Sequence, residues 1–298
     1  MQYFQHLCIL AKKFIKLIAK SNKKRKNMKK FKLSVLAMAL TTMLGFTSCL
    51  DNGDSDYGGG GYGAEIVRNS SYLGTHSFVN QYGAIYEPLN ASQVTTWPST
   101  EFSYIMYSYE AEEVTDTTDN RINVTLMTLA AVNDGSVLAR RPTDTDANAP
   151  VNYFATGDGN AVAFYQLNDM ILSINFFRRN VDNDEVLEEI DKHQFSLYYN
   201  AEEDFTSSSM TFYLRHNVTD LQDDDNFNVT VSNLYHFNMA SAFAQYQQMF
   251  GKEPTRIVIS YEQNSSNGSY EDNMVADRTY EFNYEDMVKN YKTWLEQR

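Results

Sequence analysis

The chain has 298 residues, of which 43% are apolar and 14% aromatic, enough to bury a sizeable core and to argue against wholesale disorder. Its formal charge of −13 is the sum of two unlike segments. Residues 1–48 hold 11 Lys and Arg and no Asp or Glu. Residues 49–298 hold 14 Lys and Arg and 38 Asp and Glu, which gives them a net charge of −24. Because nucleic-acid binding needs clustered basic residues, this balance argues against a nucleic-acid partner.

Residues 1–27 are basic and amphipathic. Such a stretch is compatible with a disordered basic leader or a helix on a membrane surface. The simpler interpretation is that translation starts at Met28, so that the upstream residues reflect a mis-assigned start. We favour that interpretation.

Residues 28–48 have the layout of a signal peptide. Lys29, Lys30 and Lys32 form a basic start, and an apolar stretch follows over residues 33–44. That stretch is shorter than the roughly 20 residues that span a bilayer. The sequence therefore predicts a cleaved signal, with the cut between Ser48 and Cys49.

Cys49 is the cysteine that cleavage leaves at the new N-terminus. The other cysteine is Cys8, so the mature chain has one thiol and no disulfide. A lone cysteine at this place resembles the lipid acceptor of bacterial lipoproteins, although Phe46 stands where such signals usually have Leu. We expect an outer-membrane protein anchored through acyl chains on Cys49 and facing the cell surface, with the periplasmic face as the alternative. An ordinary secretory signal is the competing interpretation.

Residues 49–63 contain three Asp followed by four consecutive Gly. This composition predicts a flexible tether, and its acidic start resembles the export signal of surface lipoproteins in the Bacteroidetes. A calcium loop is not expected, because the sixth and twelfth positions of the run are Asp56 and Tyr62 instead of Gly and Glu.

From Ala64 onward, short alternating runs of β-branched and aromatic residues predict strands packed as a barrel or a sandwich. The runs are residues 102–109, 121–129, 170–177, 193–199, 209–216, 226–231 and 256–261. Two helices are predicted near the end of the chain. One covers residues 240–250, between the cap Asn238 and Gly251, and the other covers 284–295 after the cap Asn283.

The apolar stripe of the second helix is expected to pack on a sheet; it consists of Met287, Val288, Tyr291 and Leu295. A change of domain is predicted within residues 140–150, where Pro142 and Pro150 interrupt the strand pattern. The expected domains are residues 64–148 and 149–298.

Two runs in the second half carry a family resemblance: KHQFSLYY at residues 192–199 and FYLRHN at 212–217. With the lipoprotein head, the tether and the small first β domain, they resemble the NigD-like lipoproteins of Bacteroides and Prevotella. The resemblance covers Met28 to about Tyr261. It implies an all-β fold, with a small OB-like barrel followed by a β-sandwich with one or two short helices. It also implies a role in bacteriocin self-protection and supplies no catalytic residues.

Signatures of common enzymes are missing from the sequence, including GxSxG, HExxH, GxxxxGK[ST] and CxxC. Four histidines follow the signal: His76, His193, His216 and His236. None lies three or four residues from another, so a zinc site would have to be assembled by the fold. His193 and His216 lie on predicted strands that could bring them together, and we expect hydrogen-bonded histidines of a sheet face there.

Acidic clusters at residues 112–113, 202–204 and 223–225 suggest a glycosidase pair, but each falls between predicted strands, where we expect solvated carboxylates. Tyrosines within residues 104–109 and 198–199 are expected to belong to the core, with a binding platform as the alternative. Thr117 follows Asp116 in a pattern similar to O-glycosylation sites of the Bacteroidetes.

The expected function is that of a non-enzymatic outer-membrane lipoprotein that presents two β domains for binding, and the family resemblance implies a role like bacteriocin immunity. We predict no catalytic residue, no metal site and no cofactor. The partners expected are the membrane, through the lipid anchor, and a protein toxin or a glycan. A surface glycan-binding module is the main alternative, which a row of exposed Tyr or Trp on one sheet face would favour. A hydrolase is the second alternative and would need convergent carboxylates or histidines in a pocket.

Overall fold

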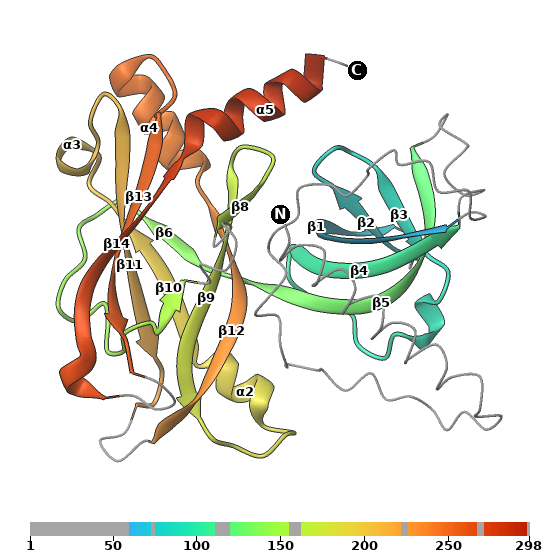
Figure 1. The fold of residues 1–298 in the computed structure, drawn as a ribbon, viewed down its shortest axis with the longest axis horizontal. Helices are drawn as coiled ribbons and strands as arrows, with labels where there is room; N and C mark the ends of the chain where they lie inside the picture. The colour runs from blue at the N-terminus through green and yellow to red at the C-terminus, as the bar shows by residue number, and fades with distance from the viewer. Residues whose placement is uncertain are drawn as a thin grey trace, which may run out of the picture. The chain divides into compact units, whose positions relative to one another are not determined.

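The computed structural model describes residues 60–72, 75–110, 120–154, 162–221, 226–266 and 271–296. The structure is mostly β, as the sequence predicts, and consists of a five-stranded barrel followed by a second part with a mixed sheet (Figure 1). Each of the seven predicted strand runs lies in a strand or overlaps one for nearly all of its length. The predicted signal, Cys49 and Thr117 lie outside the described residues.

Five strands form the barrel, drawn from blue to green in Figure 1. They are β1 (Gly60–Tyr72), β2 (Thr75–Asn80), β3 (Ile85–Pro88), β4 (Phe102–Glu110) and β5 (Arg121–Asp134). Their order is β3-β2-β1-β4-β5, and parallel pairing of β3 with β5 closes the ring. The short 3₁₀ helix η1 (Ala91–Gln93) lies between β3 and β4. Side chains from the strands fill the interior, among them Val67, Phe78 and Ile105.

Strand β1 begins earlier than the predicted end of the tether. Gly60 to Gly63 pair with β4, so the expectation of a flexible tether is wrong for these four residues. The physical reason is close packing: an added Cβ at Gly61 or Gly63 would overlap the ring of Tyr109 or Tyr107, respectively. The glycines are therefore required by the rings of the neighbouring strand.

The barrel sheet continues into the second part of the structure. β12 (Phe227–Asn238) pairs in parallel with the end of β5 through Tyr235 and His236, and antiparallel with β9 (Asp169–Arg179). β7 (Tyr153–Phe154) and β8 (Val162–Tyr165) complete this sheet against β9. A shared cluster of buried side chains joins barrel strands to β8, β9 and β12; it contains Phe102, Tyr104, Val132, Tyr165, Ile171 and Leu234.

A second, mixed sheet has the order β14-β13-β11-β10-β6. Its strands are β6 (Ser136–Leu138), β10 (His193–Tyr198), β11 (Ser209–Val218), β13 (Arg256–Asn264) and β14 (Val275–Asn283). β6 pairs with β10, and β11 with β13, in parallel, whereas the other pairs are antiparallel. One large core combines buried residues of this sheet with those of β9 and β12, including Phe176, Phe195, Phe212 and Phe237.

The chain enters the mixed sheet immediately after Gly135. β6 starts at Ser136 and pairs with β10, ahead of the proline-containing residues 140–150 at which the sequence predicts the change of domain. A Cβ at Gly135 would overlap the ring of Phe237, so a glycine suits the point where the chain leaves the barrel. Residues 136–148 are thus associated with the second part.

Both predicted helices are present as α4 (Ala240–Phe250) and α5 (Tyr284–Glu296). Gly251 ends α4 with a φ of 66°, and the Asn283 side chain accepts a hydrogen bond from the Asp286 amide at the start of α5. Val288 of the α5 stripe is buried, but Leu295 is 50% exposed, so the expected packing is wrong for that residue.

Three further short helical segments were not expected: α2 (Val186–Asp191), α3 (Ala201–Asp204) and the 3₁₀ helix η4 (Asp272–Met274). α2 and α3 are too short and too acidic to carry a periodic apolar signal. Within the described residues, no helix is long and apolar enough to cross a membrane.

Candidate functional site

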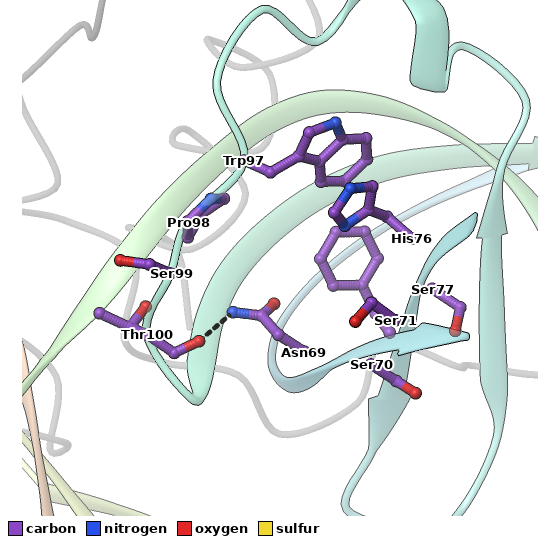
Figure 2. A pocket seen from close by; sticks show the side chains of 10 residues that line it. Asn69, Ser70, Ser71, His76, Ser77, Trp97, Pro98, Ser99 and Thr100 are labelled. Carbon is purple, nitrogen blue, oxygen red and sulfur yellow. Dashed lines mark hydrogen bonds between the residues drawn. The ribbon is translucent and has the colours of Figure 1, made fainter. Parts of the chain in front are cut away.

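A cavity of about 280 Å³ opens on the barrel where β1 and β2 meet the segment before β4 (Figure 2). Asn69, Ser70 and Ser71 come from the end of β1, facing Phe78, Ser77 and His76 of β2 in an antiparallel register. The segment before β4 adds the remaining lining residues, Trp97, Pro98, Ser99 and Thr100. Alternate strand residues point to opposite faces, so Asn69, Ser71, His76 and Phe78 share one face.

The aromatic side of the cavity is a stack of two rings. The imidazole of His76 lies parallel to the indole of Trp97, with ring centroids 4.1 Å apart and an interplanar angle of 6°. Phe78, which is buried in the barrel core, contacts Trp97 with ring centroids 6.0 Å apart. The stack is thereby attached to the core of the barrel, whereas His76 itself is exposed.

The polar side of the cavity is set by Asn69. Its side-chain Nδ2 donates to the carbonyl oxygen of Thr100 over 2.7 Å, as Figure 2 shows. Its backbone amide donates to the backbone carbonyl oxygen of Glu101. The Oδ1 atom of Asn69 is shielded from solvent and has no hydrogen-bond partner. The amide is therefore fixed in orientation while keeping a free acceptor.

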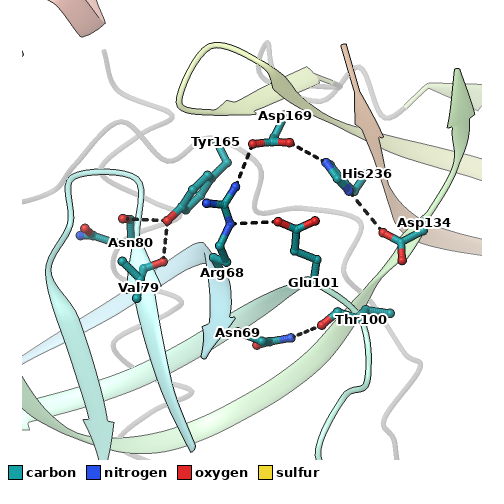
Figure 3. A network of polar contacts seen from close by, with 10 residues as sticks. All are labelled: Arg68, Asn69, Val79, Asn80, Thr100, Glu101, Asp134, Tyr165, Asp169 and His236. Atoms are coloured by element: carbon teal, nitrogen blue, oxygen red, sulfur yellow. Dashed lines mark hydrogen bonds and ion pairs between the residues drawn. The ribbon is translucent and has the colours of Figure 1, made fainter. Parts of the chain in front are cut away.

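A second feature is a network of charges around Arg68, where the barrel meets β9 and β12 (Figure 3). The guanidinium of Arg68 lies 3.1 Å from Asp169 and 3.1 Å from Glu101. Asp169 also contacts His236 Nε2 at 2.9 Å, and His236 Nδ1 lies 3.2 Å from Asp134. Although burial acts in the opposite direction, the two carboxylates raise the pKa of His236 above its ordinary value. In this arrangement, carboxylates from both parts of the chain lie beside the basic side chains of Arg68 and His236.

The barrel interior contains a carboxylate bound by two tyrosines. The hydroxyls of Tyr86 and Tyr107 donate to Glu65 Oε1 over 2.6 and 2.7 Å. Burial raises the pKa of Glu65, and these hydrogen bonds act against that rise. Because Glu65, Tyr86 and Tyr107 come from three different strands, the cluster ties β1, β3 and β4 together.

The predicted meeting of two histidines is confirmed. His193 Nδ1 lies 2.9 Å from His216 Nε2 on the neighbouring strand, and His216 Nδ1 contacts the carbonyl oxygen of Pro150. Both rings are buried, as expected for structural histidines. His76 and His236 lie in the separate sites described above. Among the described residues, no group of three or more His, Cys, Asp or Glu is arranged to hold a metal ion.

The expectation of solvated acidic clusters is wrong for Asp204. This residue ends α3 with a side chain that is only 2% exposed and contacts Arg141, while its neighbour Glu203 is 59% exposed. The clusters at residues 112–113 and 223–225 lie outside the described residues. The carboxylate of Asp204 also accepts hydrogen bonds from the Asn200 amide and the Tyr213 hydroxyl, so it is engaged in local structure.

The tyrosines singled out in the sequence belong mainly to the core. Tyr104, Tyr107, Tyr198 and Tyr199 are buried. The exposed aromatic residues of the described part, Tyr62, Tyr82 and Tyr153, lie on different elements and form no row on one sheet face.

The cavity residues were missed in the sequence. The available signal was weak: Trp97 is one of only two tryptophans in the chain and stands before a proline in a polar segment. Asn69 gave no signal, because an asparagine near the end of a strand is common and its free acceptor depends on the position of Thr100.

These features define a mostly β protein with two parts and a small, open cavity on its barrel, lined without Asp, Glu, Lys or Arg. No protein-family model matches the sequence. No curated protein matches it either.

Solved structures that are similar to the chain include three from Bacteroides species. A Bacteroides fragilis protein named "Putative lipoprotein" has a TM-score of 0.61 and 20% identity, covering 75% of this chain and 98% of that protein. A Bacteroides vulgatus protein of unknown function has a TM-score of 0.47 and 13% identity, covering 75% and 91%. A NigD-like immunity protein from Bacteroides caccae has a TM-score of 0.44 and 14% identity, covering 74% and 96%.

A protein named "Putative lipoprotein" and a protein named NigD-like are among the structural matches. At 20% identity, the match to the Bacteroides fragilis protein shows a shared fold. The match extends over nearly the whole of that protein, so both the barrel and the second part have counterparts there.

Proposed function

We propose that this chain is a non-enzymatic lipoprotein, held on the outer membrane through acyl chains on Cys49, that presents its barrel and second part for binding at the cell surface. The observation that carries the proposal is the position of Cys49. It ends a basic and then apolar stretch, and the first strand begins only eleven residues later, at Gly60. A short tether of this kind would keep the folded part near the bilayer.

Two finer points belong to the same proposal. The closed five-stranded barrel, with its parallel β3–β5 pairing, supports an OB-like domain. The common core of β9 and β12 with the mixed sheet supports a β-sandwich in the second part. The likeness of fold to the Bacteroides fragilis protein, which is named "Putative lipoprotein", supports lipid anchoring.

The anchor is tested by Cys49→Ala, expressed with the complete signal and followed by membrane fractionation. We expect the wild-type protein in the membrane fraction, with an acylated N-terminal cysteine in mass spectra, and the variant in the soluble fraction. Cys8→Ala is the matched control, because Cys8 is the other cysteine and precedes the signal. Protease treatment of intact cells then distinguishes the surface from the periplasmic face. A variant that stays with the membrane would contradict the proposal.

For the partner, the net charge of −24 on residues 49–298 favours a cationic protein, as the immunity role implied by the sequence resemblance would require. Electrostatic steering of such a partner is screened by salt, with a Debye length of about 8 Å at physiological ionic strength. We expect association with a cationic bacteriocin to slow at least several-fold between low and high salt in surface plasmon resonance. A salt-independent association rate would count against this partner.

A further inference from the structure

We propose that the cavity between Trp97 and Asn69 binds a single uncharged sugar ring. This deepens the proposed binding function by assigning a ligand class to one site of the barrel. It is independent of the acidic charge of the chain and of any protein partner.

The residues that line the cavity favour an uncharged ligand over a charged one. None of its ten residues is Asp, Glu, Lys or Arg, although residues 49–298 are rich in acids. The neighbouring charges of Arg68 and Glu101 compensate each other at 3.1 Å, and Arg68 is also paired with Asp169. A phosphate, a carboxylate or an amine would therefore lose water without gaining an opposite charge.

The ring stack supplies an apolar surface that is already in place. Trp97 stacks on His76 and also contacts the core residue Phe78, so binding requires little ordering of its side chain. Pro98 extends this surface on the neighbouring side of the cavity (Figure 2). The C–H face of a pyranose matches an aromatic surface that is apolar yet partly accessible to water.

The opposite side of the cavity supplies hydrogen bonds suited to hydroxyl groups. Asn69 Oδ1 is a shielded acceptor without a partner, held in place because Nδ2 is bonded to Thr100. Leaving such an acceptor unsatisfied is costly, so a small shift of the Asn69 side chain toward the cavity would be favoured by a hydrogen bond from a ligand hydroxyl. The hydroxyl of Ser71, on the same strand face, can both donate and accept, as sugar hydroxyls also do. Alternating donors and acceptors next to an apolar plane are the pattern that a sugar ring presents.

The size and the place of the cavity agree with this ligand. A volume of about 280 Å³ lies at the lower end of the range of small-molecule sites, which suits one ring more than a long chain. Asn69 stands nine residues after Gly60 on β1, so at roughly 3.3 Å per residue it lies about 30 Å along the strand from the anchored end. The cavity is therefore at the C-terminal end of β1, whereas Cys49 precedes the N-terminal end of this strand in the sequence.

The chain offers an internal reporter for a binding test, since Trp97 and Trp294 are its only tryptophans. In the full-length protein with Trp294→Phe, fluorescence reports on Trp97 alone. We would titrate this protein with the methyl glycosides of glucose, galactose, mannose and N-acetylglucosamine. Glucuronic acid and glucosamine serve as charged counterparts, and a neutral Gly-Ser peptide tests the alternative of a peptide ligand.

We expect a saturable change of emission with at least one neutral glycoside and weaker binding of its charged counterparts. Asn69→Leu and His76→Ala should each lower the affinity about tenfold, the loss typical of a truncated anchor in a binding site. Tyr62→Ala is the matched control, because Tyr62 is an aromatic residue of the same strand that is 68% exposed and does not line the cavity. Circular dichroism of each variant establishes that the barrel remains folded.

The inference is overturned if no glycoside gives a saturable change, if only the peptide does, or if Asn69→Leu, His76→Ala and Tyr62→Ala all bind alike. These outcomes are separate from those of the Cys49→Ala experiment. A protein that is anchored but binds no sugar would retain the proposed function and lose only this site.

Discussion

His193 Nδ1 and His216 Nε2 are 2.9 Å apart, and the two imidazole rings stack with their centroids 5.1 Å from each other inside the second core. Burial lowers the pKa of His193 to about 4, despite the nearby Glu189 carboxylate. Burial and the neighbouring His193 lower the pKa of His216 to about 3. At neutral pH, both rings are therefore uncharged and can share one N–H···N hydrogen bond.

This pair predicts a loss of stability in mild acid. In the unfolded chain, both histidines titrate near a pKa of about 6.5. Between that pH and about 4, the unfolded chain binds protons that the folded chain excludes, so the free energy of unfolding falls as the pH falls. We expect a loss of about 3 kcal/mol between pH 7 and pH 5, measured by urea unfolding.

The double variant His193→Asn, His216→Asn should flatten this dependence, even if it is less stable at pH 7. His76→Asn is the matched control, because it removes an exposed histidine and leaves the buried pair in place. His236 acts in the opposite direction, since its raised pKa favours the folded state in acid. An equally steep acid loss in the double variant would show that other groups are responsible.

Substitution by Ala is expected to destabilise the protein to different extents at Gly61 and at Gly63, near the start of β1. At Gly63, an added methyl group would overlap the ring of Tyr107, which is buried and whose hydroxyl is bonded to Glu65. At Gly61 it would overlap Tyr109, which is only half-buried and can move aside. We expect Gly63→Ala to cost about 2 kcal/mol of stability and Gly61→Ala clearly less. Thermal unfolding of the two variants measures the difference, and equal costs would refute the explanation by ring packing.

Strands with a regular pattern are the part of the fold that the sequence predicts best. β11 alternates between buried and half-buried positions along its whole length, and the predicted run within β9 carries six apolar residues, among them Ile171, Ile174 and Phe176. β14 was missed because its residues VADRTYEFN include three charged side chains and few apolar ones. The short β6, β7 and β8 have too few residues for any period to be recognised.

Sites that depend on register or on distant contacts could be predicted only in part. His193 and His216 were expected on neighbouring strands, but their contact requires the register that pairs Phe195 with His216 and places His193 diagonally across. Trp97 and Asn69 are 28 residues apart, and no spacing rule connects a loop tryptophan with the end of a strand. The cavity follows from tertiary structure alone.

Asp204 and Glu203 are adjacent acidic residues, and we expect their substitution by Ala to lower the stability by different amounts. The Asp204 carboxylate accepts a hydrogen bond from the backbone amide of Asn200 over 2.7 Å and another from the Tyr213 hydroxyl. Asp204→Ala removes these acceptors, so we expect a loss of about 2–4 kcal/mol. Glu203→Ala removes an exposed contact to Arg141 and should change stability by less than about 1 kcal/mol. Urea unfolding at pH 7 compares the two, and similar losses would argue against the structural role of Asp204.

Asp169 connects the barrel to the second part, because it receives Arg68 from β1 and His236 from β12. Its side chain is 8% exposed, whereas that of Arg68 is 38% exposed. Asp169→Ala would leave Asp134 as the remaining carboxylate beside His236 and Glu101 as the remaining carboxylate beside Arg68. We expect a loss of about 2–3 kcal/mol, reduced by the access of solvent to Arg68.

Hydrogen exchange of Asp169→Ala distinguishes local opening between β5 and β12 from a general loss of stability. If Asp169 holds the barrel against β9 and β12, then Asp169→Ala should increase amide hydrogen exchange in β5 and β12 near Asn133 and Tyr235, where these strands pair. Lys292→Ala is the matched control, since it removes an exposed ion pair with Glu253 and should leave exchange at these strands unchanged. Uniform exchange changes across β10, β11 and β13 would instead indicate a general loss of stability. Protection that stays at the wild-type level near Asn133 would mean that the shared cluster of Phe102, Tyr165 and Leu234 is sufficient to hold the two parts together.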